Sequence, residues 1–193
     1  MEKSTEIIFK LIVAVCEGND IGKNNTLPWK LKSELSYFAR MTKTTEDPSK
    51  QNAVIMGRKT WESIPEKFRP LKGRLNVVLT RSSKQDICAS DNSSVLVCKS
   101  LEDAIKCLEN IKEDNKIESC WVIGGAGVYA EAMRNDRLQE IYLTRILEKF
   151  DCDTFLPDIP ADKWKITSDG KVDEKLQEEN GTKFQYQVFK RII

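Results

Sequence analysis

Short apolar runs alternate with amphipathic segments along this chain of 193 residues. Runs rich in Val, Ile and Leu predict buried strands at residues 7–15, 53–56, 74–80, 95–98, 119–123 and 141–146. Apolar residues at helical spacing predict helices at residues 31–41, 58–64, 101–111 and 128–133. Two β-rich segments around Glu179-Asn180-Gly181 predict an antiparallel hairpin near the C-terminus. This alternation predicts an α/β fold in a single domain, 1–193, with a central mixed, mainly parallel β-sheet flanked by helices and an antiparallel C-terminal hairpin.

The predicted helix at residues 31–41 carries a carboxylate on its apolar side. Leu31, Leu35 and Phe38 recur at the spacing of one helical face, and Glu34 falls on the same face. Burying a carboxylate is costly unless it is paired or functional. Glu34 is therefore either a salt-bridged edge residue or a candidate for acid–base chemistry.

Two strands run through glycine directly into a helix. Gly57 precedes Arg58 and Lys59, two cations at a helix start, where they oppose the helix dipole and favour a bound anion. In open α/β sheets, ligands bind beyond the carboxyl ends of the strands, where such turns lie.

The second glycine turn follows the strand at residues 119–123. Gly125, Gly127 and Ala130 fit the pattern G-x-G-x-x-G/A, with Glu148 at the distance expected of a ribose partner. A tight turn with no ligand fits the same residues, so both interpretations stay open on this pattern alone.

Charge is unevenly distributed although the chain as a whole carries only +1. Residues 50–84 hold nine Lys and Arg against Glu62 and Glu66, a net charge of +7 that leaves −6 for the remainder. Such a local basic segment favours small anionic ligands over a polyanion. A solvated basic face is the alternative.

Residue types that are missing narrow the chemistry. There is no histidine, which excludes histidine-based catalytic triads and histidine metal ligands, and we expect no metal site. The six cysteines form no C-x-x-C pair, and Cys16, Cys98 and Cys120 lie in or beside apolar strands, as reduced buried thiols do in a cytoplasmic protein. Residues 1–6 do not resemble a signal peptide, and no run reaches the length of a membrane helix.

Four motifs in order resemble the dihydrofolate reductase family of the animal type. They are Leu27-Pro-Trp29 followed by Glu34, the segment from Met56 to Pro65, the segment from Arg69 to Arg74, and the segment from Val122 to Tyr129. The resemblance spans most of the chain and implies the fold of that family. It also implies NADPH-dependent reduction of 7,8-dihydrofolate to 5,6,7,8-tetrahydrofolate, a step of one-carbon and thymidylate metabolism.

The resemblance assigns three residues to catalysis. Glu34 matches the carboxylate that orients the pterin ring and assists protonation at N5 through a water molecule. Thr144 matches the threonine that holds this carboxylate, and Trp29 matches the tryptophan that braces the water. A raised pKa, which is expected of a carboxylate on an apolar face, suits this role.

Other matched positions imply binding roles. Arg74 matches the arginine that clamps the α-carboxylate of the glutamate tail, a task suited to a guanidinium. The remaining substrate positions implied are Leu27, Leu35, Phe38, Ile64, Leu71, Ile123 and Tyr129.

For NADPH, the resemblance places the 2′-phosphate at Arg58 and Arg81 and the pyrophosphate and nicotinamide at the second glycine turn. These cations replace Glu148 as the adenosine-end partners. The Gly124–Gly125 peptide is cis in the family. The implied cofactor positions are Ala14, Ile21, Gly22, Gly57, Arg58, Lys59, Thr60, Leu79, Thr80, Arg81, Lys99, Gly124, Gly125, Ala126, Gly127 and Val128.

Two other functions fit some of these features. A reductase for another pteridine or a pyrimidine, as in riboflavin biosynthesis, would keep the fold but would not need Arg74. A nucleotide- or RNA-binding protein would use the basic segment but not Glu34. The expected partners are dihydrofolate, folate and antifolates, with no membrane and no obligate protein partner, for a cytoplasmic monomer; weak binding to RNA stays open.

Overall fold

The computed structural model describes residues 6–87, 92–114 and 116–192. Its helices are α1 (Lys32–Lys43), α2 (Arg58–Ser63), α3 (Lys84–Ile87), α4 (Leu101–Glu113) and α5 (Ala126–Met133), with a short 3-10 helix at Glu66–Phe68. Its strands are β1 (Phe9–Val15), β2 (Asp20–Gly22), β3 (Gln51–Gly57), β4 (Arg74–Leu79), β5 (Val95–Cys98), β6 (Ile117–Gly124), β7 (Leu138–Ile146), β8 (Thr154–Phe155), β9 (Trp164–Thr167), β10 (Gln177–Glu179) and β11 (Thr182–Arg191).

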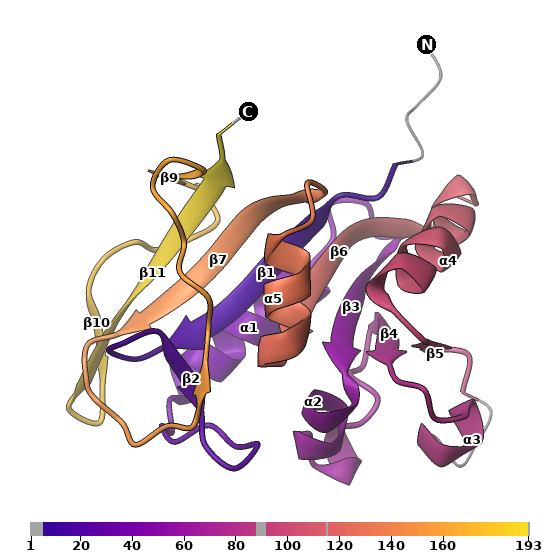
Figure 1. The fold of residues 1–193 in the computed structure, drawn as a ribbon. Coiled ribbons are helices and arrows are strands. Elements are labelled where there is room, and N and C mark those ends of the chain that lie inside the picture. The colour runs from indigo at the N-terminus through magenta and orange to yellow at the C-terminus, as the bar shows by residue number, and fades with distance from the viewer. Residues whose placement is uncertain (1–5, 88–91, 115, 193) are drawn as a thin grey trace.

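Nine strands form one twisted sheet in the order β10-β11-β7-β1-β6-β3-β4-β5, with β9 also paired to β11 (Figure 1). The strands from β7 to β5 in this order are all parallel. β11 runs antiparallel to β7, and β9 and β10 run antiparallel to β11. The predicted mixed, mainly parallel sheet with an antiparallel C-terminal hairpin is confirmed.

Helices cover both faces of the sheet, so its central strands are apolar on both sides. In Figure 1, α5 lies in front of the sheet and α1 behind it. One apolar cluster joins α4 and α5 to residues such as Phe9, Leu11 and Ile55. The other joins α1 and α2 to residues such as Ile12 and Met56. Alternate residues of β1 and β3 thus supply the two cores, as the period of a strand requires.

The C-terminal hairpin turns at Asn180 and Gly181, whose φ angles of 53° and 82° are those of a tight two-residue hairpin turn. Glu179, the residue before this turn, reaches the start of α1. Its carboxylate accepts hydrogen bonds from the backbone N–H groups of Lys32 and Ser33, at 2.8 and 2.9 Å, and from the Ser33 hydroxyl. The hairpin therefore caps a helix that lies far from it in sequence.

The structure corrects the predicted packing face of α1. Leu35 was expected on the packed side, but it is 54% exposed. The buried positions are instead Glu34, Tyr37, Met41 and Thr42, because the Tyr37 ring stacks on Tyr186 of β11 at a centroid distance of 3.9 Å. The face of α1 is therefore rotated toward the hairpin, and Glu34 keeps its buried position.

Smaller differences concern boundaries and short elements. The apolar runs locate the strands correctly but shorten β6 and β7, because polar residues separate the paired first residues Ile117 and Leu138 from the rest of each run. The pairing of β2 with β8 was not predicted, because each strand is only two or three residues long. In the described residues no helix combines the length and the apolarity needed to cross a bilayer.

Candidate active site

The carboxyl ends of the parallel strands bring several of the predicted site residues to one edge of the sheet. Gly57 at the end of β3 pairs with Leu79 at the end of β4, and Met56 pairs with Gly124 at the end of β6. On the next pair of strands, Ala14 of β1 lies opposite Thr144 of β7. Parts of the sequence more than one hundred residues apart therefore meet at this edge.

Glu34 projects from the first turns of α1 and is only 5% exposed. The hydroxyl of Thr144, which is fully buried on β7, donates a hydrogen bond of 3.3 Å to a Glu34 carboxylate oxygen. Burial raises the pKa of Glu34 to about 7, and the hydrogen bond from Thr144 opposes this only in part. No lysine or arginine in the described part of the chain forms an ion pair with it. The carboxyl group can therefore take up and release a proton near neutral pH.

Arg74 is the second nearly buried charge, at 7% exposure, and it stands at the start of β4. One guanidinium nitrogen donates a 2.7 Å hydrogen bond to the hydroxyl of Thr42, and the Nε group donates to the Lys72 carbonyl. Within residues 6–87, 92–114 and 116–192, no carboxylate pairs with it, and burial lowers its pKa. A buried guanidinium without a counter-ion is suited to bind a carboxylate or phosphate.

The helix α1 joins these two charges. Glu34 near its start contacts Thr144, and Thr42 near its end contacts Arg74. Eight residues of an α-helix rise by about 12 Å. The site thus offers an ionisable carboxyl group and an unpaired cation. The α1 residue that carries the first and the α1 residue that contacts the second are about 12 Å apart along the helix, enough for a small extended ligand between them.

Apolar side chains of one core cluster surround α1. Trp29 is buried, its ring meets Phe150 edge-on at 5.6 Å, and its indole N–H has no hydrogen-bond partner among the described residues. The predicted positions Ala14, Phe38, Ile64, Leu71 and Ile123 belong to the same cluster as Trp29.

Two predicted substrate positions stand apart from this cluster, since Leu27 and Leu35 are 48% and 54% exposed. Tyr129 is buried, but its ring belongs to the cluster on the opposite face of the sheet, and its hydroxyl donates a 2.9 Å hydrogen bond to the Ile12 carbonyl. The structure therefore places Tyr129 beside the glycine turn rather than among the other apolar positions.

The second glycine turn allows β3, α2 and α5 to approach closely. The Gly124–Gly125 peptide bond is cis, as the resemblance implied, and Gly124 has a φ of 129°. A Cβ atom on either glycine would lie 3.3 Å from the hydroxyl oxygen of Thr60, and one on Gly57 would lie 3.2 Å from a Val128 methyl group. No side chain caps the start of α5, so its first N–H groups remain available to an anion.

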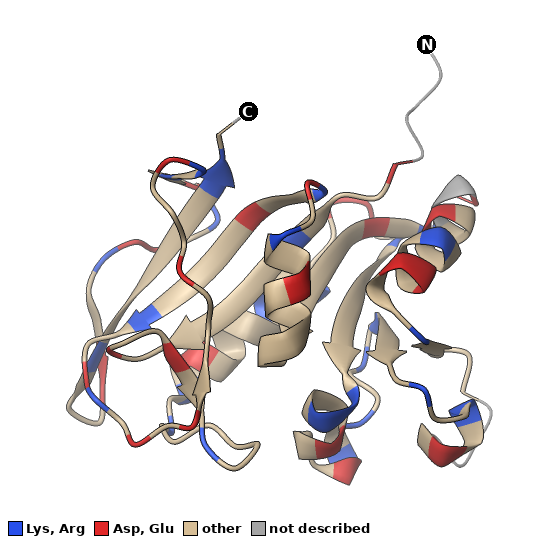
Figure 2. Ribbon diagram, viewed as in Figure 1, with Lys and Arg blue, Asp and Glu red and all other residues tan. Residues whose placement is uncertain are grey.

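Basic side chains lie next to this turn but are exposed. The Arg58 side chain is 54% exposed; it pairs with Glu62 at 2.6 Å and donates a hydrogen bond to the Ser82 hydroxyl at 3.1 Å. Figure 2 shows lysine and arginine positions on α2, and Lys59, Arg81 and Lys99 are exposed as well. Arg58 therefore links the start of α2 to the loop after β4.

The remaining predicted cofactor positions lie in or beside β2, at the end of β4 and at the start of α5. Ile21 and Gly22 lie in β2 beside the end of β1. Leu79 ends β4, and Thr80 follows it, where the Thr80 hydroxyl accepts a hydrogen bond from the Ser82 N–H group. Ala126 and Gly127 begin α5. The structure thus gathers most of the predicted cofactor positions along the carboxyl edge, where such turns lie in open α/β sheets.

Sequence reasoning missed three residues that the structure places at the site: Thr42, Ser82 and Phe150. Thr42 carried a signal, because it lies eight positions after Glu34 on the same helix. The discarded ribose partner Glu148 accepts a hydrogen bond from the Thr182 hydroxyl instead.

Comparison with known proteins gives a consistent result. A family model described as dihydrofolate reductase matches residues 8–191. The dihydrofolate reductase of Drosophila melanogaster is 49% identical over 183 residues, covering 95% of this chain and 97% of the relative. That of Sus scrofa is 44% identical and covers 93% and 96%. The solved dihydrofolate reductase of Schistosoma mansoni superposes with a TM-score of 0.82 at 36% identity, covering 96% and 98%.

Proposed function

The chain belongs to the dihydrofolate reductase family, whose members reduce dihydrofolate to tetrahydrofolate, and we propose that it performs this reaction with NADPH as the hydride donor. The reaction consumes dihydrofolate, NADPH and one proton and yields tetrahydrofolate and NADP⁺. The proposal covers residues 1–193 as one catalytic domain.

The observation that carries the proposal is that α1 holds the Glu34 carboxyl group near its start and contacts the Arg74 guanidinium, through Thr42, near its end. Dihydrofolate has a polar pterin head that must gain a proton at N5, and a glutamate tail that ends in carboxylates. A carboxyl group with a pKa of about 7 suits the first end. A buried guanidinium that makes no ion pair within the described ranges suits the second.

Glu34 binds and orients the pterin in this proposal. Its carboxylate accepts hydrogen bonds from the amino group and the ring nitrogen of the pterin. A water molecule, assisted by Glu34, delivers the proton to N5. The buried Trp29 indole N–H, which has no protein partner among the described residues, supplies a donor for that water. Thr144 keeps the carboxyl group in position through its hydrogen bond.

The residues at the carboxyl edge fit a dinucleotide. The uncapped start of α5 and the side-chain-free positions Gly124 and Gly125 leave room for a pyrophosphate close to the backbone. When bound, the nicotinamide ring supplies hydride to the pterin carbon next to N5. The protein aligns the two rings and excludes water around them.

Exposed cations favour NADPH over NADH in this proposal. Arg58 and Arg81 are the residues proposed for the 2′-phosphate, with Ser82 holding Arg58 toward the loop after β4. Lys59 and Lys99 add positive charge nearby. No carboxylate is assigned to the ribose.

A spectrophotometric assay tests the proposal. Purified protein is given NADPH with dihydrofolate, with a pteridine lacking the glutamate tail, or with no second substrate, and each is repeated with NADH. We expect rapid NADPH oxidation only with dihydrofolate, blocked by an antifolate. Equal turnover of the tail-less pteridine would instead favour the alternative reductase, and no turnover of either compound would contradict the proposal.

A further inference from the structure

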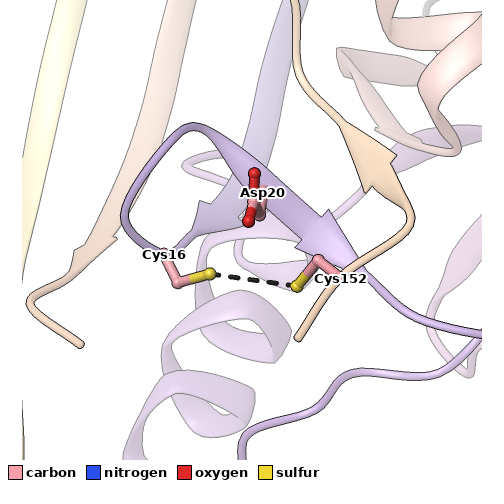
Figure 3. Close-up of side chains that lie close together, drawn as sticks. All are labelled: Cys16, Asp20 and Cys152. Atoms are coloured by element: carbon pink, nitrogen blue, oxygen red, sulfur yellow. Dashed lines mark hydrogen bonds between the residues drawn. The ribbon is translucent and has the colours of Figure 1, made fainter. Parts of the chain in front are cut away.

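Two thiols and a carboxylate converge beside the proposed cofactor site. Cys16 directly follows β1, Asp20 opens β2, and Cys152 comes two residues before β8, which pairs with β2. Figure 3 shows Cys16 and Cys152 with their sulfur atoms facing each other and Asp20 above them. The two sulfur atoms are 3.9 Å apart, and all three candidate ligand atoms lie within 4.8 Å of one another.

The spacing of the sulfur atoms fits a shared metal ion. Zinc–thiolate bonds are about 2.3 Å long, so two sulfur ligands of a tetrahedral zinc ion are about 3.8 Å apart. A disulfide bond is only about 2.05 Å long. The observed 3.9 Å, at which one thiol donates a hydrogen bond to the other, is already close to the spacing of two zinc-bound sulfur atoms.

Asp20 adds an independent observation. Its half-buried carboxylate accepts no hydrogen bond and makes no ion pair in the described residues. Nearby cations are engaged elsewhere, since Lys23 pairs with Asp151 and Arg145 donates to Asn19.

The two segments that form the cluster are also acidic. Residues 16–23 and 147–158 contain six Asp and Glu against two Lys. A divalent cation would give the Asp20 carboxylate the partner that the protein does not provide, in surroundings that attract positive charge.

We propose that Cys16, Asp20 and Cys152 bind one zinc ion, with water as the fourth ligand. Zinc suits two thiolates and one carboxylate, and both thiols give their protons to solvent as they bind. The ion would tie the corner between β1 and β2 to the segment before β8. Ile21 and Gly22, which are proposed to contact the cofactor, lie inside this corner.

Zinc binding is measured on the whole protein, reduced with a phosphine and freed of metal. Zinc is titrated in competition with a chromophoric chelator, and cadmium serves as a second probe because its thiolate complexes absorb in the ultraviolet. We expect one zinc ion per chain and a cadmium–thiolate band. Cys16→Ser and Cys152→Ser should each weaken zinc binding by more than about tenfold and remove most of the band, with a smaller loss in Asp20→Asn.

Cys107→Ser is the matched control, because this exposed thiol on α4 pairs with Cys98 in a second thiol pair. It should leave the zinc affinity unchanged. Cys152 is only partly buried, so Cys152→Ser is expected to fold even where Cys16→Ser does not. Equal zinc affinity in Cys152→Ser and the unmodified protein would overturn the proposal, and an unchanged affinity in Asp20→Asn would remove Asp20 as a ligand. Neither readout depends on the proposed reaction.

Discussion

The side of the site that contacts α1 and the side formed by α2 hold their charged groups in contrasting environments. Glu34 and Arg74 are nearly buried and have no oppositely charged partner among the described residues. Arg58 is half-exposed and already pairs with Glu62. An unpaired buried charge is costly to the apoprotein but is strongly stabilised by a complementary ligand, whereas an exposed charge interacts weakly and is screened by salt. The buried side should therefore control chemistry and substrate identity, and the exposed side should tune cofactor affinity.

The largest expected effect is that of Glu34→Gln. The amide cannot ionise, so proton transfer to the substrate loses its assistance and kcat at pH 7 should fall by about 10²–10⁴. In the unmodified protein, turnover should decline as the pH rises through about 7, because the protonated carboxyl group is lost. This pH step should be missing in the variant. The exposed Glu102→Gln on α4 is the control, and steady-state kinetics against pH is the measurement.

The stability of the same variant separates lost chemistry from misfolding. Burial raises the pKa of Glu34 from 4.5 to about 7, so its contribution to stability is complete below pH 4.5 and is lost as the pH rises through about 7. Glutamine avoids this loss. At pH 8, Glu34→Gln should therefore be more stable to denaturant by up to about 3 kcal/mol. Lower stability at pH 8 would show that the carboxylate is not held as described.

Arg74→Leu should have the next largest effect. Removing the cation that faces a buried carboxylate costs about 3–5 kcal/mol, and each 1.4 kcal/mol is about tenfold. The kcat/KM for dihydrofolate should accordingly fall by about 10² to 4 × 10³. The kcat/KM for a pterin without the glutamate tail should be unchanged in Arg74→Leu. The control variant Lys72→Leu, which removes an exposed cation two residues earlier, should leave kcat/KM for dihydrofolate unchanged. An unchanged KM for dihydrofolate in Arg74→Leu would show that Arg74 does not bind the glutamate tail.

Arg58→Ala tests the exposed side. We expect the KM for NADPH to rise by about tenfold, as the loss of a partly exposed charge–phosphate contact of roughly 1.5 kcal/mol implies. The effect should shrink at high salt, and KM for NADH should not change. Lys106→Ala on α4 provides a cation-removal control away from the site. Equal changes for NADPH and NADH would argue against a 2′-phosphate contact.

The smallest expected effect is that of Gly127→Ala. A Cβ atom there meets nothing within 4 Å, and the residue lies within α5. Stability should rise by about 0.5–1 kcal/mol. Gly181→Ala is the counterpart, since its space is equally open but its φ is 82°. It should lose about 1 kcal/mol, as thermal unfolding would reveal.

The sequence predicted the parts of the fold that depend on local pattern. Unbroken apolar runs located the parallel strands, and helical spacing placed Glu34 on the packed face of α1. The same spacing misplaced Leu35, because the orientation of α1 is decided by Tyr186, which lies on the last strand. No pattern within residues 31–41 carries that information.

In the candidate site too, the features visible as local motifs were predicted and those that depend on contacts between distant residues were not. The glycine turns and their neighbouring cations were visible as motifs, and the resemblance supplied Arg74. The contact between Arg74 and Thr42 was not predictable, because it joins the start of one strand to the end of a helix. The cluster of Cys16, Asp20 and Cys152 was missed because its cysteines are 136 positions apart and form no spaced motif.

Glu179 gives the last hairpin a part in the timing of activity during synthesis. It caps the helix that carries Glu34, and β11 pairs with the strand that carries Thr144. A growing polypeptide makes α1 early but receives this cap and this neighbouring strand only when residues 177–191 have left the ribosome. A nascent chain with only residues 6–170 outside the ribosome lacks both the cap on α1 and the strand beside Thr144, so the surroundings of Glu34 are incomplete until β10 and β11 emerge.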